Sequence, residues 1–426
     1  MLIHKEPRRV AVVGYNRIPF ARHNTAYAYA SNVDMMTASL DGLVSKYKLQ
    51  GQRLGEVAGG AVIKHTREFN LIRESVMGTS LDPATPACDI QQACATGMEA
   101  AIYIANKIAL GQINVGVAGG VDSASNVPVV ISEPLRRILL EARKAKSFGG
   151  RLKQFMKIRP KHLVPVAPGI DERRSKLSMG GHTEISSKHY GISREDQDRF
   201  ALESHQKMAK AYDEGFLGDM LTPYLGLDRD NNLRRDTSME KLARLEPAFD
   251  PINGSLTAGN STPFSDGASC VLLASEEWAQ EHNLPVLAYI SFAEVAAIEF
   301  VNERQNLLMA PVHAATRMLQ KANLNLQDFD FYEIHEAFAA QVLTTLKIWE
   351  SAALMKTFGY DKPLGSIDRS KLNIKGSSLA AAHPFAATGG RLIATMAKLL
   401  NEKGSGRGFI SVCASGGQGV TMIMEK

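Results

Sequence analysis

Short apolar runs alternate with longer, periodic stretches along most of the chain. Several runs are continuous rather than alternating, which is typical of strands buried on both faces. Strands are predicted at residues 10–13, 60–63, 115–118, 270–274, 286–290, 329–334, 409–413 and 420–424. In intervening stretches such as 95–110 and 389–400, apolar residues recur at the spacing of a helix. This alternation predicts an α/β fold with a largely buried sheet.

Two stretches far apart in the chain share a pattern. ACATGMEAA starts at Ala93, and FAATGGRLI starts at Phe385. Each is followed by a predicted helix, a turn, a strand and a double glycine, which ends at Gly120 in one case and at Gly417 in the other. The shared order predicts a duplicated domain. Residues 123–250 break the pattern, so we interpret them as an insertion in the first of two similar halves.

The insertion contains one clear helix signal, ISREDQDRFALESHQKMAKAYDEG. Ser193 and Asp196 have the spacing of a helix-capping pair. Phe200 and Met208 fall on one face with Tyr212, which predicts an amphipathic helix. The glycine at position 215 is the expected stop.

Composition narrows the class of protein. The chain has 426 residues, 45% hydrophobic and 22% charged, which is typical of a globular protein of two or three domains. Four cysteines are too few for a disulfide framework, so a reducing compartment is expected. The start lacks the apolar core of a signal peptide, and no apolar run is long enough to span a membrane. The expected location is therefore the cytoplasm.

The net charge of +5 is distributed unevenly, because one segment carries most of the excess positive charge. Residues 136–161 contain ten Lys or Arg and one acid, a net charge of +9, so the rest of the chain has a net charge of −4. Apolar residues at helical spacing are interleaved with these charges. Such a segment can lie on an anionic membrane surface or bind an acidic partner. The alternative is a solvated helical face that binds only the phosphates of a ligand.

Cys94 is the first candidate for chemistry. It stands between an irregular apolar segment and a predicted helix, and three small residues follow it. A thiol at a helix N-terminus faces unpaired N–H groups and the positive end of the helix dipole, which lowers its pKa. We therefore expect a reactive Cys94 with a lowered pKa. Ordinary packing is the alternative, and it suits Cys88 and Cys270 better.

Three further positions could take part in catalysis. His383 lies at the counterpart of the Cys94 turn in the second half, where a base could meet a nucleophile. Cys413 ends a predicted strand that leads into a glycine-rich turn, whose N–H groups can bind an anion. His335 follows the strand FDFYEI, and open α/β sheets place ligands at such strand ends. The alternative for His383 is a loop histidine without a catalytic role, and the alternative for the glycine-rich turn after Cys413 is a plain turn.

Several other functions lack support in the sequence. The 11 histidines are dispersed, and no set of potential ligands has the spacing of a metal site, so no metal is expected. Neither a GxxxxGK[ST] loop nor a GxGxxG strand–helix turn occurs, which argues against nucleotide hydrolysis and hydride transfer. Binding of nucleic acid is not expected, because no fold motif accompanies the basic segment.

Taken in order, the motifs resemble those of the thiolase family along essentially the whole chain. The matching stretches are RIPFAR, QQACATGMEAA, GGVDSAS, ISREDQD with SHQKMAKA, LTAGNSTPFSDGAS, HEAFAAQ, AAHPFAATGGR and CASGGQGVTMIM. Histidine in place of the usual asparagine in HEAF, and the long basic insertion, look like the thiolase subunit of fatty-acid oxidation complexes, the trifunctional β-subunit type.

The resemblance implies a thiolase-like fold. Two similar βαβαβαββ halves would form five αβαβα layers, with a loop domain inserted in the first half. The N-terminal half would comprise residues 1–122 and 251–278, the loop domain 123–250, and the C-terminal half 279–426. The internal repeat and the insertion agree with this organisation.

The resemblance also implies 3-ketoacyl-CoA thiolase chemistry, with coenzyme A thioesters as substrates and no cofactor. Cys94 would attack the 3-oxo carbon after His383 takes its proton, and Cys413 would protonate the departing acetyl-CoA carbanion. His335 would hold a water that forms one oxyanion hole with His383. The backbone N–H groups of Cys94 and Ser415 would form the other.

The resemblance also implies which residues bind the substrate, and three positions depart from the family pattern. Met179, Thr262 and Phe338 would line the pantetheine and acyl tunnel, with core packing as the alternative for Met179 and Phe338. The usual glycines of the family are replaced by Ser415, Ala382 and Ala386. A serine keeps the backbone donor of its position readily only if φ is negative.

Other functions stay open. A short-chain acetoacetyl-CoA thiolase that works in the condensation direction is the nearest alternative. Cys413 argues against a decarboxylating condensing enzyme, and the three intact catalytic residues argue against a non-catalytic lipid-binding or scaffold subunit. The expected partners are acyl-CoA and CoA, a second copy in a homodimer or a dimer of dimers, and a hydratase/dehydrogenase α-subunit. Peripheral membrane association through 136–161 would modify the cytoplasmic location.

Overall fold

The computed structural model describes residues 6–166 and 169–426, and its strands form one large mixed sheet. The strand order is β4-β3-β5-β6-β1-β7-β10-β9-β8, with β2 paired to β6. The strands are β1 (Val10–Arg17), β2 (Ala21–Arg22), β3 (Glu56–Gly59), β4 (Ala87–Asp89), β5 (Val115–Ser123), β6 (Ser265–Ser275), β7 (Ala288–Ala297), β8 (Phe331–Ile334), β9 (Arg407–Ala414) and β10 (Gln418–Glu425).

Two sheet segments from the two halves of the chain meet at one short junction. β1 pairs antiparallel with β6 along most of its length, but it pairs with β7 only at residues 10–12. The β1–β7 ladder is therefore the link between the strands of the first half and those of the second. Parallel pairs lie toward both ends, where β3 joins β4 and β5, and β8 joins β9.

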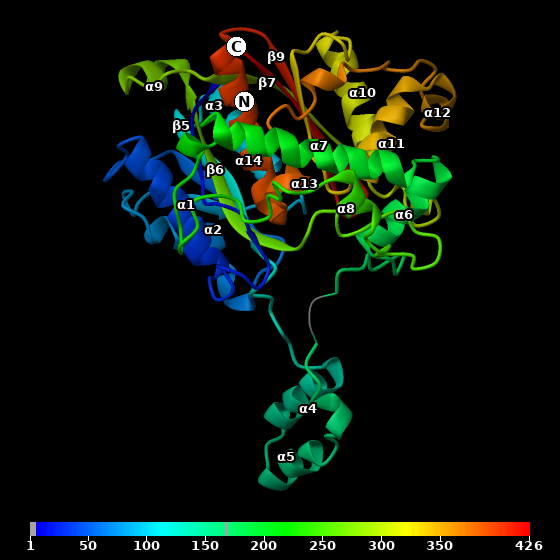
Figure 1. The fold of residues 1–426 in the computed structure, drawn as a ribbon. Helices are drawn as coiled ribbons and strands as arrows, with labels where there is room; N and C mark the ends of the chain where they lie inside the picture. Colours follow the sequence, from blue (N-terminus) through cyan, green and yellow to red (C-terminus); the bar gives the residue numbers. More distant parts are fainter. Residues whose placement is uncertain (1–5, 167–168) are drawn as a thin grey trace.

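Helices cover both faces of each sheet segment (Figure 1). α1 and α2 pack outside the first segment, α10 and α11 outside the second, and α3 and α14 lie between the two. The helices are α1 (Asn32–Lys46), α2 (Leu71–Met77), α3 (Thr96–Ala109), α4 (Glu133–Lys144), α5 (Phe148–Phe155), α6 (Met179–His189), α7 (Arg194–Asp213), α8 (Met239–Ala243), α9 (Glu276–Glu281), α10 (Ala310–Ala322), α11 (Ala339–Glu350), α12 (Ala352–Thr357), α13 (Ser378–Ala381) and α14 (Thr388–Lys403). This layering confirms the predicted α/β fold.

The internal repeat has a packing explanation. α3 and α14 approach each other through their first turns, which are the two ATG stretches. A Cβ atom on Gly97 would lie 2.7 Å from the Ala386 carbonyl oxygen, and one on Gly389 would lie 2.3 Å from the Met98 nitrogen. Both glycines are therefore required by the close approach of the two helices, which brings the Cys94 turn next to the His383 turn.

The predicted helix of the insertion is confirmed as α7. Ser193 is its N-cap, and its hydroxyl accepts a hydrogen bond from the backbone N–H of Asp196. Met208 is buried on the inner face. The helix ends at Asp213, and Gly215 follows with φ +74°, as the stop signal indicated.

The prediction of a strand at 60–63 is wrong, because the strand β3 (Glu56–Gly59) lies four residues earlier. At Gly60 the chain passes so close to the Ile90 carbonyl that a Cβ atom would lie 1.9 Å from its oxygen. The next backbone N–H groups, those of Val62 and Ile63, donate to the Asp122 carboxylate rather than to a strand. The three-residue β4 was not predicted, since so short a strand leaves no periodic signal.

The basic segment forms a helical hairpin, α4 and α5, that projects from the rest of the molecule (Figure 1). Leu135 and Ala142 are its buried positions, and α5 has none. No helix in the described part of the chain is long and apolar enough to cross a membrane.

Candidate active site

The Cys94 turn is held by a local hydrogen-bond network. The hydroxyl of Thr96 accepts from the backbone N–H of Gln92 at 2.9 Å and donates to the Ala93 carbonyl at 2.7 Å. Ala93 adopts φ +46°, which makes the turn tight. α3 begins at Thr96, two residues beyond Cys94, so the thiol does not occupy the N-cap position.

The prediction of a lowered pKa at Cys94 is wrong. Burial raises the pKa of the Cys94 thiol to about 12, and hydrogen bonds from the backbone N–H groups of Ser415 and of Cys94 itself only partly offset it. The Cys94 residue keeps some exposure, but protein atoms surround its sulfur. At neutral pH the resting side chain is therefore a thiol, which needs a base to become a nucleophile.

His383 and His335 form a pair of buried rings. Their centroids are 4.1 Å apart, with 47° between the planes. His383 lies just before the 3-10 helix Phe385–Ala387, and its Nδ1 is 2.5 Å from the Thr388 hydroxyl. His335 follows β8, and its Nδ1 is 2.8 Å from the Ser378 hydroxyl. The Nε2 atom of each ring is buried and has no hydrogen-bond partner among residues 6–166 and 169–426, so both atoms are free to bind a substrate.

Burial sets the protonation of this pair. It lowers the pKa of His383 to about 3, and the positive charge of Arg391 adds to the effect. Burial, the second ring and Arg391 hold the pKa of His335 well below its ordinary value. Both rings are therefore neutral near pH 7. A neutral His383 can accept a proton, as a general base must.

Cys413 is buried near the end of β9. Burial raises the pKa of its thiol well above the ordinary range, and the second cause is the charge of Cys94. The two sulfurs are thus close enough for the ionisation of one to oppose that of the other. The next turn has positive φ at Gly416 and Gly417, but not at Ser415, so the condition for a backbone donor at Ser415 is met.

Comparison with known proteins identifies the family. The model of the thiolase N-terminal domain matches residues 10–277, and that of the thiolase C-terminal domain matches residues 284–426. The chain belongs to the thiolase family. It is 38% identical to the 3-ketoacyl-CoA thiolases of Yersinia pestis (strain Pestoides F) and Yersinia pseudotuberculosis, over all of this chain and 98% of theirs.

Solved thiolase structures share the fold over nearly the full length. The acetyl-CoA acetyltransferase of Bacillus anthracis superimposes with a TM-score of 0.81 and 28% identity, and 99% of each chain is covered. Human mitochondrial 3-ketoacyl-CoA thiolase, solved in complex with CoA, gives a TM-score of 0.80 and 26% identity, with 98% of each chain covered.

In this thiolase, an alanine on each side of His383 shapes its loop. Ala382 has φ +78° and ψ 177°, a conformation that L-residues rarely adopt. Ala386 is fully buried, and its N–H donates to the Asp122 carboxylate at 2.8 Å. The same carboxylate accepts from the loop after β3. Asp122 thereby ties the loop that carries His383 to the first half, a role the sequence did not indicate.

The three predicted substrate-binding residues fall into two groups. Thr262 and Phe338 lie together, because the N–H and the hydroxyl of Thr262 both donate to the Ala337 carbonyl. The Phe338 ring is buried and packs edge-on against Phe249. Met179 is the first residue of α6 and is only partly buried, against the apolar core around α10 and α11. Their role in binding stays a prediction.

The structure adds one contact that sequence patterns did not predict. Glu172, in the insertion, accepts hydrogen bonds from the Ser415 hydroxyl at 2.8 Å and from the Gly416 N–H at 2.6 Å. The insertion therefore contacts the turn that follows Cys413. No local signal could have revealed a contact between residues 243 positions apart.

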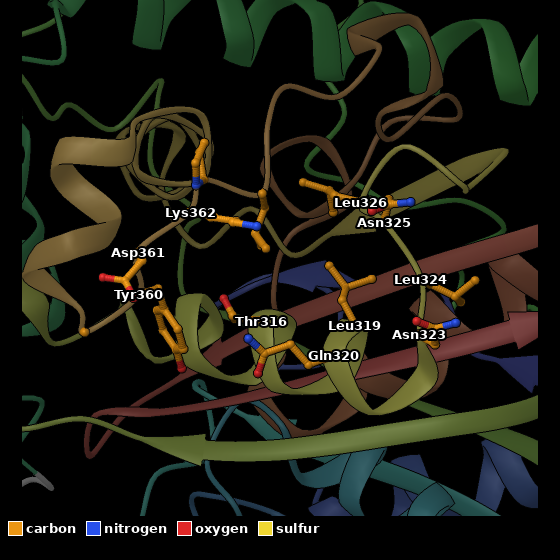
Figure 2. Close-up of a pocket in the computed structure, with 13 residues that line it drawn as sticks. Thr316, Leu319, Gln320, Asn323, Leu324, Asn325, Leu326, Tyr360, Asp361 and Lys362 are labelled. Carbon is orange, nitrogen blue, oxygen red and sulfur yellow. The ribbon is translucent and has the colours of Figure 1, made fainter.

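A pocket of about 680 Å³ lies away from this cluster (Figure 2). Leu319 and Gln320 of α10 line it together with Tyr360, Asp361 and Lys362. None of the catalytic candidates lines this pocket. In the described part of the chain, no group of three or more His, Cys, Asp or Glu side chains could hold a metal ion.

Proposed function

We propose that this thiolase is a 3-ketoacyl-CoA thiolase of fatty-acid β-oxidation. Identity of 38% to the Yersinia enzymes of that name, over the whole chain, supports the substrate class. The observation that carries the catalytic assignment is the pair of buried Nε2 atoms on His383 and His335 that lack a partner in the described part of the chain. The loop after His383 packs against the first turn of α3, just beyond Cys94, and the charge of Cys94 acts on Cys413.

Cleavage would begin at Cys94. His383 Nε2 takes the Cys94 proton, and the sulfur attacks the 3-oxo carbon of the substrate. The bond between C2 and C3 then breaks, and its electron pair leaves as the acetyl-CoA carbanion. Cys413 donates a proton to that carbanion, which leaves Cys413 as a thiolate and Cys94 as a thioester.

The second half of the cycle restores the enzyme. The Cys413 thiolate takes the proton of incoming CoA, and the CoA sulfur attacks the acyl group on Cys94. The Cys94 thiolate leaves and regains its proton from His383. The products are acetyl-CoA and an acyl-CoA shortened by two carbons.

Two oxyanions need stabilisation during these steps. We assign one to His383 with a water held by His335, and the other to the backbone N–H groups of Cys94 and Ser415. The hydrogen bonds of these two N–H groups toward the Cys94 sulfur support the second assignment. An oxyanion-hole donor is typically worth about 2.7–4 kcal/mol of the barrier.

Two cysteine variants test these roles. Cys94→Ala should abolish the covalent acyl-enzyme seen by intact-protein mass spectrometry. Cys413→Ala should still form the acetyl-enzyme from acetyl-CoA but lose carbon–carbon cleavage and condensation. Cys88→Ala, half-buried in β4, is the matched control and should retain both. Condensation of acetyl-CoA by Cys413→Ala at the wild-type rate would show that the assigned role is wrong.

Chain length separates this proposal from its nearest alternative. A short-chain acetoacetyl-CoA thiolase working toward condensation would resemble the Bacillus anthracis acetyltransferase in its reaction as well as its fold. Thiolysis rates should be measured on 3-oxoacyl-CoA substrates from four to sixteen or so carbons. Thiolysis of substrates longer than acetoacetyl-CoA is expected, and activity on acetoacetyl-CoA alone would favour the alternative.

We also propose that the α4–α5 hairpin docks on an anionic membrane surface. Its exposed apolar side chains include Phe148, which is 82% exposed, and Met156, which is 72% exposed. They stand among the ten basic residues of 136–161. Basic heads around exposed apolar residues match an interfacial helix. An acidic partner protein and the CoA phosphates are the competing ligands.

Sedimentation with anionic liposomes tests the hairpin. The full chain should pellet with the vesicles, and a chain in which a short linker replaces residues 136–161 should stay in the supernatant. Vesicles of neutral lipid are the control, and both forms should stay in the supernatant with them. Equal pelleting of the two forms with anionic vesicles would exclude this role.

The assembly is likewise a proposal. We infer a homodimer, which could associate further into a dimer of dimers and bind a hydratase/dehydrogenase α-subunit. We place the enzyme in the cytoplasm, at the membrane periphery when the hairpin is bound. The division into halves at 1–122 with 251–278 and at 279–426, around a loop domain at 123–250, stays a prediction.

A further inference from the structure

A buried hydrogen-bond chain links Arg391 to His335. Arg391 lies in α14, and its Nη2 atom is 2.8 Å from the Ser378 hydroxyl and 3.1 Å from the Ser377 hydroxyl. Ser378, at the start of α13, is in turn 2.8 Å from Nδ1 of His335. All four residues are at least 95% buried, so water does not compete for these contacts.

The chemistry of the three groups fixes the direction of these bonds. A guanidinium only donates, so the Ser378 oxygen accepts from Arg391. The hydroxyl proton of Ser378 then needs an acceptor, and in the described part of the chain Nδ1 of His335 is the one within reach. A ring nitrogen that accepts carries no hydrogen, so the hydrogen of the neutral ring is on Nε2.

Buried titratable groups surround Arg391, and the two serine hydroxyls are its hydrogen-bond partners. Glu333 lies in β8, two residues before His335. Glu333 and Glu336 favour the charged form of Arg391, whereas Arg17 opposes it. Burial raises the pKa of Glu333 to about 8, so this carboxyl group is largely neutral near pH 7. The neighbouring ring of His383 stays neutral for the reasons given above.

We propose that Arg391 is a positioning residue that, through Ser378, fixes His335 in the tautomer with hydrogen on Nε2. The unpartnered Nε2 atom of His335 is then a donor, aimed into the site beside the His383 ring. This donor would hold the oxyanion-hole water by its oxygen and leave both water hydrogens free for the developing negative charge. Only this last use rests on the proposed function. The tautomer itself is a property of the resting protein.

Nitrogen NMR of the wild-type protein, with labelled histidine and no substrate, measures the tautomer directly. Comparison with His335→Gln identifies the two ring signals of His335 among the 11 histidines. The expected spectrum has a protonated Nε2 and an unprotonated Nδ1. A protonated Nδ1 would overturn the proposal whether or not the enzyme cleaves 3-oxoacyl-CoA. Absence of cleavage with the expected tautomer would instead overturn the proposed function.

Two neighbouring serines supply a matched pair of variants. Ser378→Ala removes the link, so His335 should populate both tautomers, and kcat should fall by about tenfold to a hundredfold with little change in KM. That loss is smaller than the 10²–10³ typical for deletion of an oxyanion donor itself. Ser377→Ala removes the other acceptor of Arg391 without touching His335, and should keep the wild-type spectrum and rate. An unchanged tautomer and rate in Ser378→Ala would refute the link.

Discussion

At the scale of single residues, the reactive groups are neutral because the free-energy cost of burying a charge exceeds the stabilisation that a helix terminus gives to it. A pKa of about 12 at Cys94, against the ordinary 9.0, corresponds to roughly 4 kcal/mol against the thiolate. A charge at a helix terminus typically gains about 0.3–1 kcal/mol. The low pKa of His383 has the same cause. The active site therefore holds a neutral thiol and a neutral imidazole, and proton transfer waits for the substrate.

The first prediction concerns the pH dependence of Cys94 alkylation. Because its pKa lies above the tested range, the thiolate fraction should rise about tenfold for each pH unit between pH 7 and 10. The rate constant for modification by iodoacetamide, followed by mass spectrometry, should rise in parallel. The Cys94→Ala variant is the control, because any label that it takes up lies on the other cysteines. A plateau reached below pH 8 would contradict the raised pKa.

The second prediction concerns backbone strain at Ala382. Its φ of +78° with ψ 177° belongs to a region that is essentially restricted to glycine and costs about 1–3 kcal/mol for other residues. Ala382→Gly removes this strain but loosens the unfolded chain by about 0.5–1 kcal/mol. We expect a net gain of about 1 kcal/mol in the free energy of unfolding, measured as a higher Tm.

A neighbouring alanine is the control for this variant. Ala381 is equally buried, but it lies in α13 and has no positive φ. Ala381→Gly should therefore lower the Tm, since only the entropy cost and the loss of packing remain. If both variants lowered the Tm to the same extent, Ala382 would not be strained.

At the scale of elements, sequence patterns sufficed where local signals define the structure. The capped α7 and the strands around Cys270 and Cys413 lie where apolar runs and caps predicted them. The fold also brings the loop after His383 against the first turn of α3, just beyond Cys94, and Cys413 lies close enough to Cys94 for their charges to interact. Burial, by contrast, depends on the whole molecule, so the direction of the Cys94 pKa was predicted wrongly.

Contacts between distant elements account for the rest of what the sequence did not reveal. The Glu172 contact with the Ser415 turn joins the insertion to the loop between β9 and β10. The segment that carries Glu172 is shaped by its own backbone bonds, from Glu172 to Leu177 and from Lys176 to Glu172. Nothing in the composition of this segment distinguishes Glu172 from the other acidic residues of the insertion.

The third prediction follows from that contact. Glu172 holds the turn whose Ser415 N–H is the proposed oxyanion donor, so Glu172→Ala should let the turn move. We expect kcat to fall by about tenfold, a part of the 10²–10³ lost when a donor is removed. Asp171→Ala, at the exposed neighbouring position, is the control and should keep the wild-type rate. Equal rates for all three proteins would show that the turn needs no support from the insertion.

At the scale of the whole molecule, the sheet ends in an open edge close to the nucleophile. β4 is the terminal strand at one end of the sheet, and it ends five residues before Cys94. The Val57 N–H bonds to the Pro86 carbonyl, and the Ile90 N–H bonds to the Gly59 carbonyl. Because alternate residues of a parallel strand face the same neighbour, the backbone groups of Ala87 and Asp89 point to the open edge. Such an edge can pair with another strand, most simply its own copy.

The fourth prediction is therefore a homodimer that depends on this edge. Light scattering of the purified protein should give twice the 46.4 kDa chain mass. Ala87→Pro removes one outward N–H and leaves the bonds of β4 to β3 in place, so it should shift the mass toward the monomer at micromolar concentration. Ala87→Ser keeps the N–H and should remain dimeric. A monomeric wild-type protein, or a dimer that is equally stable in Ala87→Pro, would show that the β4 edge is not the interface.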